Sequence, residues 1–236
     1  MGKGYFITGT DTGVGKTLVA GGLAALYKSQ GMNVGVMKPV ATGCKRVNNT
    51  LISDDSVFLK FLAEVEDEYE LINPVSLEQP LAPTVAARLS NTKIDTDKIN
   101  TAFDTLCERH EYLIVEGIGG LLVPINEYYF VVDMAEEMEL PVIVVCRPPL
   151  GTINHTLLTV SYARQHGLDV KGIIINESAE NCDTIVKDTN TDEIKRLTDL
   201  PILGTIPFHK KLDTKDYNKE LLVKIFSDNI DKDIII

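Results

Sequence analysis

The segment GTDTGVGKT, residues 9 to 17, combines three glycines with a lysine and a threonine, and it directly follows the apolar run YFIT. A glycine-rich turn between a strand and a helix lets backbone N–H groups converge on an anion, and a following Lys-Thr pair supplies a cation and a hydroxyl for a metal ion. The strict phosphate-loop pattern has Gly where this chain has Thr10, but Gly9 precedes that position and the GKT ending is intact. The segment therefore predicts a site for nucleotide phosphates.

A triphosphate site of this kind needs magnesium, which prefers hard oxygen ligands. The hydroxyl of Thr17 is the expected first ligand. Glu116 ends the apolar run YLIVE, and open parallel sheets place ligand-binding residues at such strand ends, so Glu116 is the expected second ligand. Asp54 and Asp55 precede a predicted helix, where acidic residues usually cap the helix, and spacing alone favours capping for both.

Lys38 stands before Pro39 at the end of a mostly apolar strand. A lysine in that place could simply mark a strand end that reaches solvent. If its strand runs parallel to those that end at Gly9 and Glu116, Lys38 emerges at the same edge of the sheet as Lys16. Two cations would then face the phosphates.

Short β-branched or apolar runs recur between longer segments with helical spacing, a pattern typical of strand-helix-strand units in an α/β fold with a mostly parallel sheet. The continuous apolar run at 141–146 implies cover on both faces of the sheet, so helices are expected on both sides. The expected strands are residues 5–8, 33–40, 112–117, 141–146, 170–176 and 201–207.

Apolar residues spaced by three and four predict the helices, and His110 is expected at the surface beyond the end of one of them. Ser53 is a candidate N-cap for a short helix. The other expected helices cover 16–30, about 96–109, 151–167, a polar segment that ends near 200, and 216–230.

Composition limits the function further. A chain of 236 residues with 44% apolar residues fits one domain over 1–236, and a net charge of −11 opposes attraction to nucleic acid or anionic lipid. The four cysteines form no C-x-x-C pair, and the sequence shows no secretion signal and no run of membrane-spanning length. We therefore expect a cytoplasmic protein with no nucleic-acid or membrane partner.

The motifs GTDTGVGKT, MKPVATG, VEGIGG, LGTINHTLLT, IIIN and LGTIP occur in the order and approximate spacing of dethiobiotin synthetases, which act in biotin biosynthesis. The chain resembles that family from residue 4 to about residue 208. The resemblance implies a P-loop NTPase-like α/β fold, usually a homodimer. It also implies an ATP-dependent ligase that joins the two amines of 7,8-diaminopelargonic acid through carbon dioxide or bicarbonate.

The family forms a carbamate, phosphorylates it with ATP to a carbamic-phosphoric anhydride, and closes a cyclic urea. By resemblance, Thr12 and Lys16 contact phosphates, and Lys38 stabilises the carbamate and the phosphoryl group in transfer. Asp55, by its distance from KPVATG, resembles the metal-site Asp of the family, which replaces the capping interpretation; Asp54 is the alternative if the alignment shifts by one.

The resemblance implies two further groups of residues. Thr42 is expected near the substrate, and the turn of Gly151, Thr152, Ile153 and Asn154 is expected to receive its carboxylate. Asn176 and the segment from Thr205 to Pro207 resemble the adenine pocket. The full nucleotide set is Gly13, Val14, Gly15, Lys16, Thr17, Leu18, Asp55, Glu116, Gly117, Gly119, Asn176, Thr205, Ile206 and Pro207, with Thr17, Asp55 and Glu116 holding magnesium.

The chain also departs from the family. Gly13 stands where some members carry Glu, and residues 178–198 show no clear counterpart of a tyrosine that in some members reaches the substrate across the dimer.

Two other classes share the loop. Partitioning-type P-loop switches carry an extra lysine where this chain has Asp11, and the acidic charge also argues against them. Ligases of the cobyrinic acid amidotransferase type need a glutaminase domain, which the 29 residues after Pro207 (236 minus 207) are too few to form.

Overall fold

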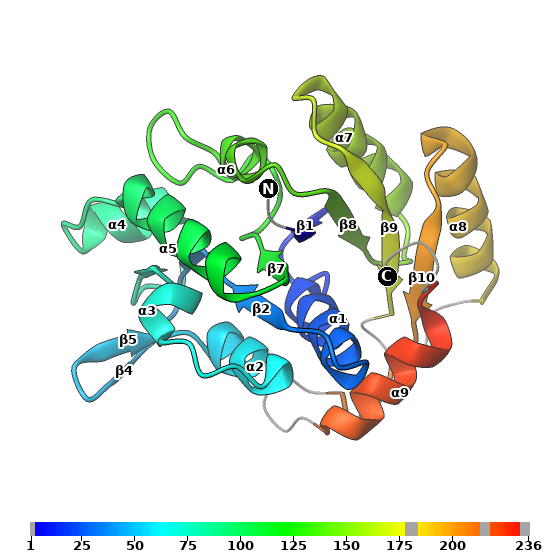
Figure 1. The fold of residues 1–236 in the computed structure, drawn as a ribbon. Helices are drawn as coiled ribbons and strands as arrows, with labels where there is room; N and C mark the ends of the chain where they lie inside the picture. The colour runs from blue at the N-terminus through cyan, green and yellow to red at the C-terminus, as the bar shows by residue number, and fades with distance from the viewer. Residues whose placement is uncertain (1–2, 178–183, 213–217, 232–236) are drawn as a thin grey trace.

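The computed structural model describes residues 3–177, 184–212 and 218–231. At its centre lies a six-stranded sheet in which every neighbouring pair is parallel (Figure 1). The order across the sheet is β10-β9-β8-β1-β7-β2. The strands are β1 (Lys3–Gly9), β2 (Val34–Met37), β7 (Tyr112–Glu116), β8 (Val142–Cys146), β9 (Val170–Asn176) and β10 (Ile202–Ile206).

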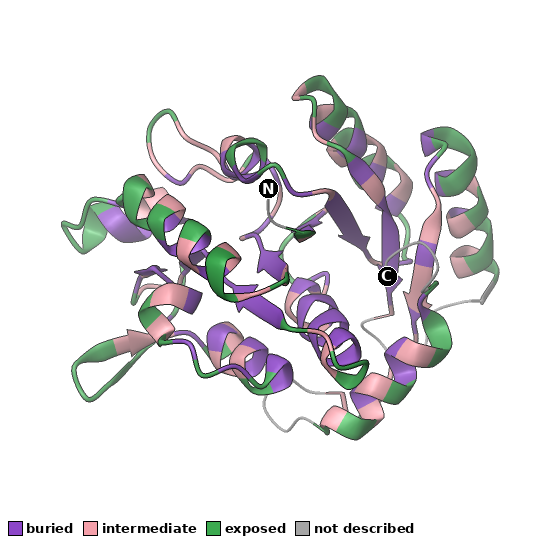
Figure 2. Ribbon diagram, in the orientation of Figure 1, coloured by how far each residue is buried: buried purple, intermediate pink, exposed green. Residues whose placement is uncertain are grey.

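Apolar residues on both faces of these strands make the sheet the middle layer of three. Phe6 packs into a cluster with α4 to α8, whereas its neighbour Ile7 packs into a second cluster with α1, α2 and α9. Successive strand residues point to opposite faces, so a continuous apolar run supplies both clusters. Figure 2 shows the buried strands between helices whose outer faces are exposed.

Helices α1 to α8 lie between strands in sequence, as strand-helix-strand units require, and α9 follows the last strand. Their bounds are α1 (Lys16–Ser29), α2 (Asp54–Ala63), α3 (Tyr69–Ile72), α4 (Pro83–Leu89), α5 (Thr96–Arg109), α6 (Val131–Met138), α7 (Thr152–Gln165), α8 (Thr184–Thr198) and α9 (Lys219–Asn229). The structure confirms the expected fold class: a mostly parallel sheet with helices on both faces.

The strand expected at 33–40 is interrupted. Strand β2 ends at Met37, and after Pro39 the chain forms β3 (Val40–Ala41), which pairs with β6 (Val75–Ser76) in a separate two-stranded sheet. Proline has no N–H for a sheet ladder, and the Lys38 N–H donates to the Ile72 carbonyl instead of to strand β7. The hairpin of β4 (Lys45–Val47) and β5 (Thr50–Ile52) follows.

His110 is not the surface residue that the sequence suggested. Its side chain is only 10% exposed, with Nε2 2.7 Å from Asp67 Oδ2 and Nδ1 2.8 Å from Asn33 Oδ1. Asp67 also accepts from Arg109, so the end of α5 is tied to the loop between α2 and α3.

Cys44, Cys107 and Cys146 are free thiols, and Cys182 lies outside the described residues. Among the described helices, none has the length and apolar character needed to cross a membrane.

Candidate functional site

The glycine-rich segment forms a tight turn between the end of β1 and the start of α1. Gly13 and Gly15 have φ values of 76° and 96°, in the left-handed region that favours glycine. A Cβ on Gly15 would also collide with the side-chain amide of Asn176, whose Nδ2 donates to the Val14 carbonyl at 2.9 Å. Both backbone conformation and close packing therefore demand glycine at position 15.

Lys16 folds back over this turn. Its side chain is buried, and Nζ donates to the Asp11 carbonyl at 3.0 Å. Burial lowers the pKa of Lys16 to about 8, so its positive charge is only partly compensated by the surrounding residues. An anion held by the turn would supply the missing compensation.

Four side chains from four different elements meet beside the turn. The ammonium of Lys38 lies 2.5 Å from Glu116 Oε1 and 2.9 Å from Asp55 Oδ2, and it also reaches the Gly117 carbonyl at 3.3 Å. Thr17 donates its hydroxyl to the same Glu116 oxygen at 2.8 Å. These side chains join four elements at the carboxyl ends of the parallel strands: the segment after β2, the start of α2, the end of β7 and the start of α1.

The charges of this cluster depend on one another. Burial raises the pKa of Glu116, while Lys38 and Thr17 act in the opposite direction. Burial alone would lower the pKa of Lys38, but the carboxylates of Glu116 and Asp55 outweigh it and raise that pKa. Burial likewise opposes ionisation of Asp55, yet Lys38 holds the pKa of Asp55 below its ordinary value. The cluster therefore contains a cation between two carboxylates.

A pocket of about 380 Å³ opens over the turn and the cluster. It brings together most of the residues that the sequence suggested for phosphates and metal, and Thr42 with them. Its lining is Thr12, Gly13, Gly15, Lys16, Thr17, Leu18, Lys38, Ala41, Thr42, Asp55, Glu116, Ile118 and Gly119.

Asp54 and Asp55 separate at the start of α2. Ser53 is the N-cap, and Asp54 pairs with the exposed Lys45 at 2.7 Å, outside the pocket. Asp55 points to Lys38 inside it. The geometry therefore favours Asp55 over Asp54 as the acid of this site.

The residues proposed for adenine lie at the same sheet edge but do not line this pocket. Asn176 ends β9 and faces Ile206 of β10, with Thr205 and Pro207 on either side. The Asn176 side chain is buried, and its Oδ1 has no hydrogen-bond partner. A buried acceptor without a partner needs an explanation, such as a water or ligand group that donates to it.

The turn expected to receive the substrate carboxylate is also outside the pocket lining. Gly151 has a φ of 92° and is the N-cap of α7, and the next residues of the turn begin that helix. The His155 N–H already donates to the Gly151 carbonyl.

Sequence reasoning missed three residues here. Ala41 and Ile118 line the pocket, and their only signal is that they lie inside the motifs VATG and GIGG. Arg147 follows β8 and pairs with Asp11 of the turn at 2.9 Å. Its position directly after a central strand was the signal that could have found it.

Comparisons with known proteins agree on the family. A family model described as "AAA domain" matches residues 3–216. A protein named ATP-dependent dethiobiotin synthetase from Thermodesulfovibrio yellowstonii is 44% identical over 96% of this chain and 97% of its own. Proteins of the same name from Bacillus subtilis and Methanocaldococcus jannaschii are each 40% identical, over 99% and 85% of this chain and 97% and 92% of their own.

Solved structures give the fold alone. The chain is similar to a ParA family ATPase from Chlorobium tepidum with a TM-score of 0.55 and 16% identity, covering 95% of this chain and 92% of that one. It is also similar to the MinC:MinD cell division complex of Aquifex aeolicus, with a TM-score of 0.54, 15% identity, and 89% and 83% coverage.

Proposed function

The chain belongs to the dethiobiotin synthetase family of C–N bond-forming ligases, and from this we propose that it uses ATP to join 7,8-diaminopelargonic acid and carbon dioxide into dethiobiotin. The observation that carries the proposal is the cluster of Thr17, Lys38, Asp55 and Glu116 beside the glycine-rich turn. The cluster places a buried cation, Lys38, in the same pocket as the turn that we propose binds phosphate. Neither the turn nor the cation is a nucleophile.

Carbon dioxide adds to one amine to give a carbamate, with loss of a proton. A carbamate oxygen then attacks the γ-phosphorus of ATP, and ADP leaves. The second amine attacks the carbamate carbon, the carbon–oxygen bond to phosphate breaks, and the amine proton is lost as the cyclic urea forms. Each step needs positioning and charge stabilisation more than a protein nucleophile.

In this proposal the turn from Gly13 to Leu18 binds the phosphates, and Lys16 and Thr12 contact them. Lys38 stabilises the carbamate and the phosphoryl group in transfer, and Thr42 lies near the substrate. Support comes from the common pocket that these residues line and from the burial of Lys38, because a preorganised cation acts most strongly away from water.

The donor set also fits magnesium. Glu116 Oε2 is buried without a hydrogen-bond partner. The Thr17 hydroxyl donates to the other oxygen of Glu116, and the Asp55 carboxylate pairs with Lys38, which also contacts Glu116. Thr17, Asp55 and Glu116 would hold the ion, which when bound would neutralise phosphate charge. All three are hard oxygen donors, as this ion prefers.

For adenine, the open Oδ1 of Asn176 supports a place at the ends of β9 and β10, with Thr205, Ile206 and Pro207 as neighbours. Gly117 and Gly119 complete the nucleotide side.

The turn of residues 151–154 receives the substrate carboxylate in this proposal. It does not line the pocket of its own chain. We propose a homodimer in which this turn of a second copy completes the site.

A P-loop switch of the partitioning type is the main alternative. The likeness to ParA and MinD proteins at 15–16% identity shows a shared fold only. Asp11, paired with Arg147, stands where such switches carry a further lysine, so the loop chemistry differs.

The test supplies the protein with diaminopelargonic acid, ATP, magnesium and carbon dioxide labelled with ¹⁸O, and measures the products by mass. Dethiobiotin should form with one label in its urea oxygen and one in the released phosphate. Dethiobiotin with unlabelled phosphate would overturn the anhydride route. Absence of dethiobiotin with every substrate present would overturn the function itself.

Light scattering should give twice the 26.0 kDa chain mass for the homodimer.

A further inference from the structure

Both backbone polar groups of Lys38 are held from outside the main sheet. The Lys38 N–H donates to the Ile72 carbonyl at 2.6 Å, and the Lys38 carbonyl accepts from Asn73 Nδ2 at 2.6 Å. The ladder of β2 with β7 ends one residue earlier, at Met37. At Lys38, whose side chain enters the site, backbone hydrogen bonds to the segment at the end of α3 therefore replace those of the sheet.

Both the nitrogen and the oxygen of the Asn73 side-chain amide have hydrogen-bond partners. Its Nδ2 also donates to the Val75 carbonyl at 3.1 Å, its Oδ1 accepts from the Ser76 hydroxyl at 2.8 Å, and the residue is buried. Two carbonyl acceptors on one side and a hydroxyl donor on the other fix the orientation of the amide.

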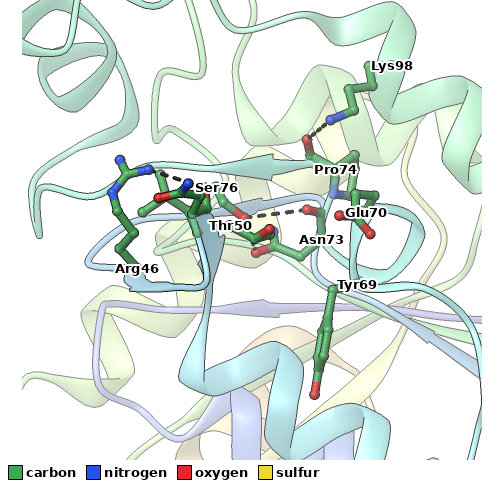
Figure 3. A pocket seen from close by; sticks show the side chains of 10 residues that line it. Arg46, Thr50, Tyr69, Glu70, Asn73, Pro74, Ser76 and Lys98 are labelled. Carbon is green, nitrogen blue, oxygen red and sulfur yellow. Dashed lines mark hydrogen bonds between the residues drawn. The ribbon is translucent and has the colours of Figure 1, made fainter.

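The same segment also holds the chain beyond Lys38. The Val75 N–H donates to the Pro39 carbonyl at 3.2 Å, and Val40 pairs with Val75 in the small sheet. Asn73 and Ser76 line a second pocket of about 310 Å³, together with Arg46 and Lys98 (Figure 3). Asn73 thus lies between that pocket and the backbone of Lys38.

We infer that Asn73 is a positioning residue for phosphoryl transfer: its bond to the Lys38 carbonyl fixes the backbone from which the ammonium reaches Glu116 and Asp55. The inference rests on the proposed role of Lys38. A reacting group that moves by about 1 Å can lose a factor of about 100 in rate, so the bond matters although Asn73 touches no substrate.

The direct test is Asn73→Ala, with turnover and ATP affinity measured side by side. Turnover at saturating substrates should fall about tenfold to a hundredfold while the Kd for ATP stays within about twofold, since the glycine-rich turn is not touched. Ser76→Ala is the matched control, because it removes a bond to Asn73 but leaves both amide donors in place. It should keep near-normal turnover. If Asn73→Ala does not fold, Asn73→Ser, which is too short to keep the bond, carries the same expectation.

A double-mutant cycle with Lys38→Gln separates positioning from a general loss of structure. Once the ammonium is gone, Asn73→Ala should change the remaining turnover by less than about twofold. Equal losses in both backgrounds, or normal turnover in Asn73→Ala alone, would overturn the inference. Normal turnover in Lys38→Gln would overturn the proposed role of Lys38 and this inference with it. If the inference alone fails, Lys38→Gln is still impaired, so the two failures are distinguishable.

Discussion

Two buried lysines lie in one pocket, and their surroundings give them opposite properties. Burial lowers the pKa of Lys16 to about 8, and its contact is a backbone carbonyl. Lys38 is also buried, but the carboxylates of Glu116 and Asp55 raise its pKa. Lys16 is therefore suited to accept an incoming anion, whereas Lys38 is a fixed charge that the protein itself already balances.

Lys38→Gln should reduce turnover with ATP affinity largely intact. Loss of one preorganised charge contact costs about 3 kcal/mol in the transition state, which is about a hundredfold in rate. Calorimetry of ATP binding and steady-state turnover with saturating diamine and bicarbonate would measure both quantities.

Lys16→Ala is the contrasting variant. It should weaken ATP binding, because the ammonium of Lys16 lies over the glycine-rich turn that we propose binds the phosphates. Unchanged ATP affinity in Lys16→Ala, or lost affinity with normal turnover in Lys38→Gln, would show that the two roles are reversed or wrong.

Glu116→Gln should raise the magnesium concentration needed for half-maximal turnover, because a neutral amide is a poorer ligand for a hard cation than a carboxylate. Asp54→Asn is the control, since Asp54 is an adjacent acid that pairs with Lys45 outside the pocket. A magnesium titration of turnover that is the same for Glu116→Gln and the unaltered protein would remove Glu116 from the metal site.

At the scale of the element, the junction between β1 and α1 depends on a strand far away in sequence. Gly15 caps α1 in the left-handed region, and Asn176 of β9 packs where its Cβ would be. The turn is thus held by its own backbone conformation and by the end of another strand.

Gly15→Ala should weaken ATP binding by at least about tenfold, because Asn176 must move and the turn is strained. Gly31→Ala is the matched control: its φ of 82° is also positive, but nothing lies within 4 Å of the added Cβ. It should lose only about 1 kcal/mol of stability, with ATP affinity unchanged. Equal ATP affinity in the two variants would contradict the packing argument.

The sequence predicted the elements better than it predicted the chain between them. All six main strands and the turn could be found because apolar runs and the GKT ending are local signals. The break at Lys38 and the contact from Asn73 could not, since α3 is a single turn of four residues without periodicity, and Asn73 is recognisable only once Lys38 lies beside it. The burial of His110 escaped for the same reason, because its partner Asp67 is 43 positions earlier in the chain.

At the scale of the whole molecule, Asp67 joins parts of the chain that are distant in sequence. Burial would raise the pKa of Asp67, but the hydrogen bonds from Arg109 and His110 outweigh it and hold that pKa below its ordinary value. A carboxylate whose pKa is lower in the folded state stabilises the fold above its unfolded pKa of about 4. That contribution is lost as the pH falls through the folded pKa.

Asp67→Asn should therefore lower the free energy of unfolding at pH 7 by about 1 to 2 kcal/mol, and the difference should shrink as the pH falls from about 5 to about 3. Urea unfolding followed by circular dichroism across that range would measure it. Glu68→Gln removes the other, exposed partner of Arg109 and should leave the profile nearly unchanged. A difference that is independent of pH would contradict the ionic origin.

The position of β1 in the sheet also affects how the chain folds during its synthesis. Both neighbours of β1 come from much later in the chain: Lys3 pairs with Tyr112, a separation of 109 residues (112 minus 3), and Phe6 pairs with Val142, a separation of 136 (142 minus 6). Contacts over such distances close slowly, because the entropy of the long loop is lost before the pairing compensates for it. During synthesis β1 and its glycine-rich turn must wait for β7 and then for β8. The glycine-rich turn at the end of β1 therefore reaches its folded surroundings only after strands more than 100 residues later in the chain have left the ribosome.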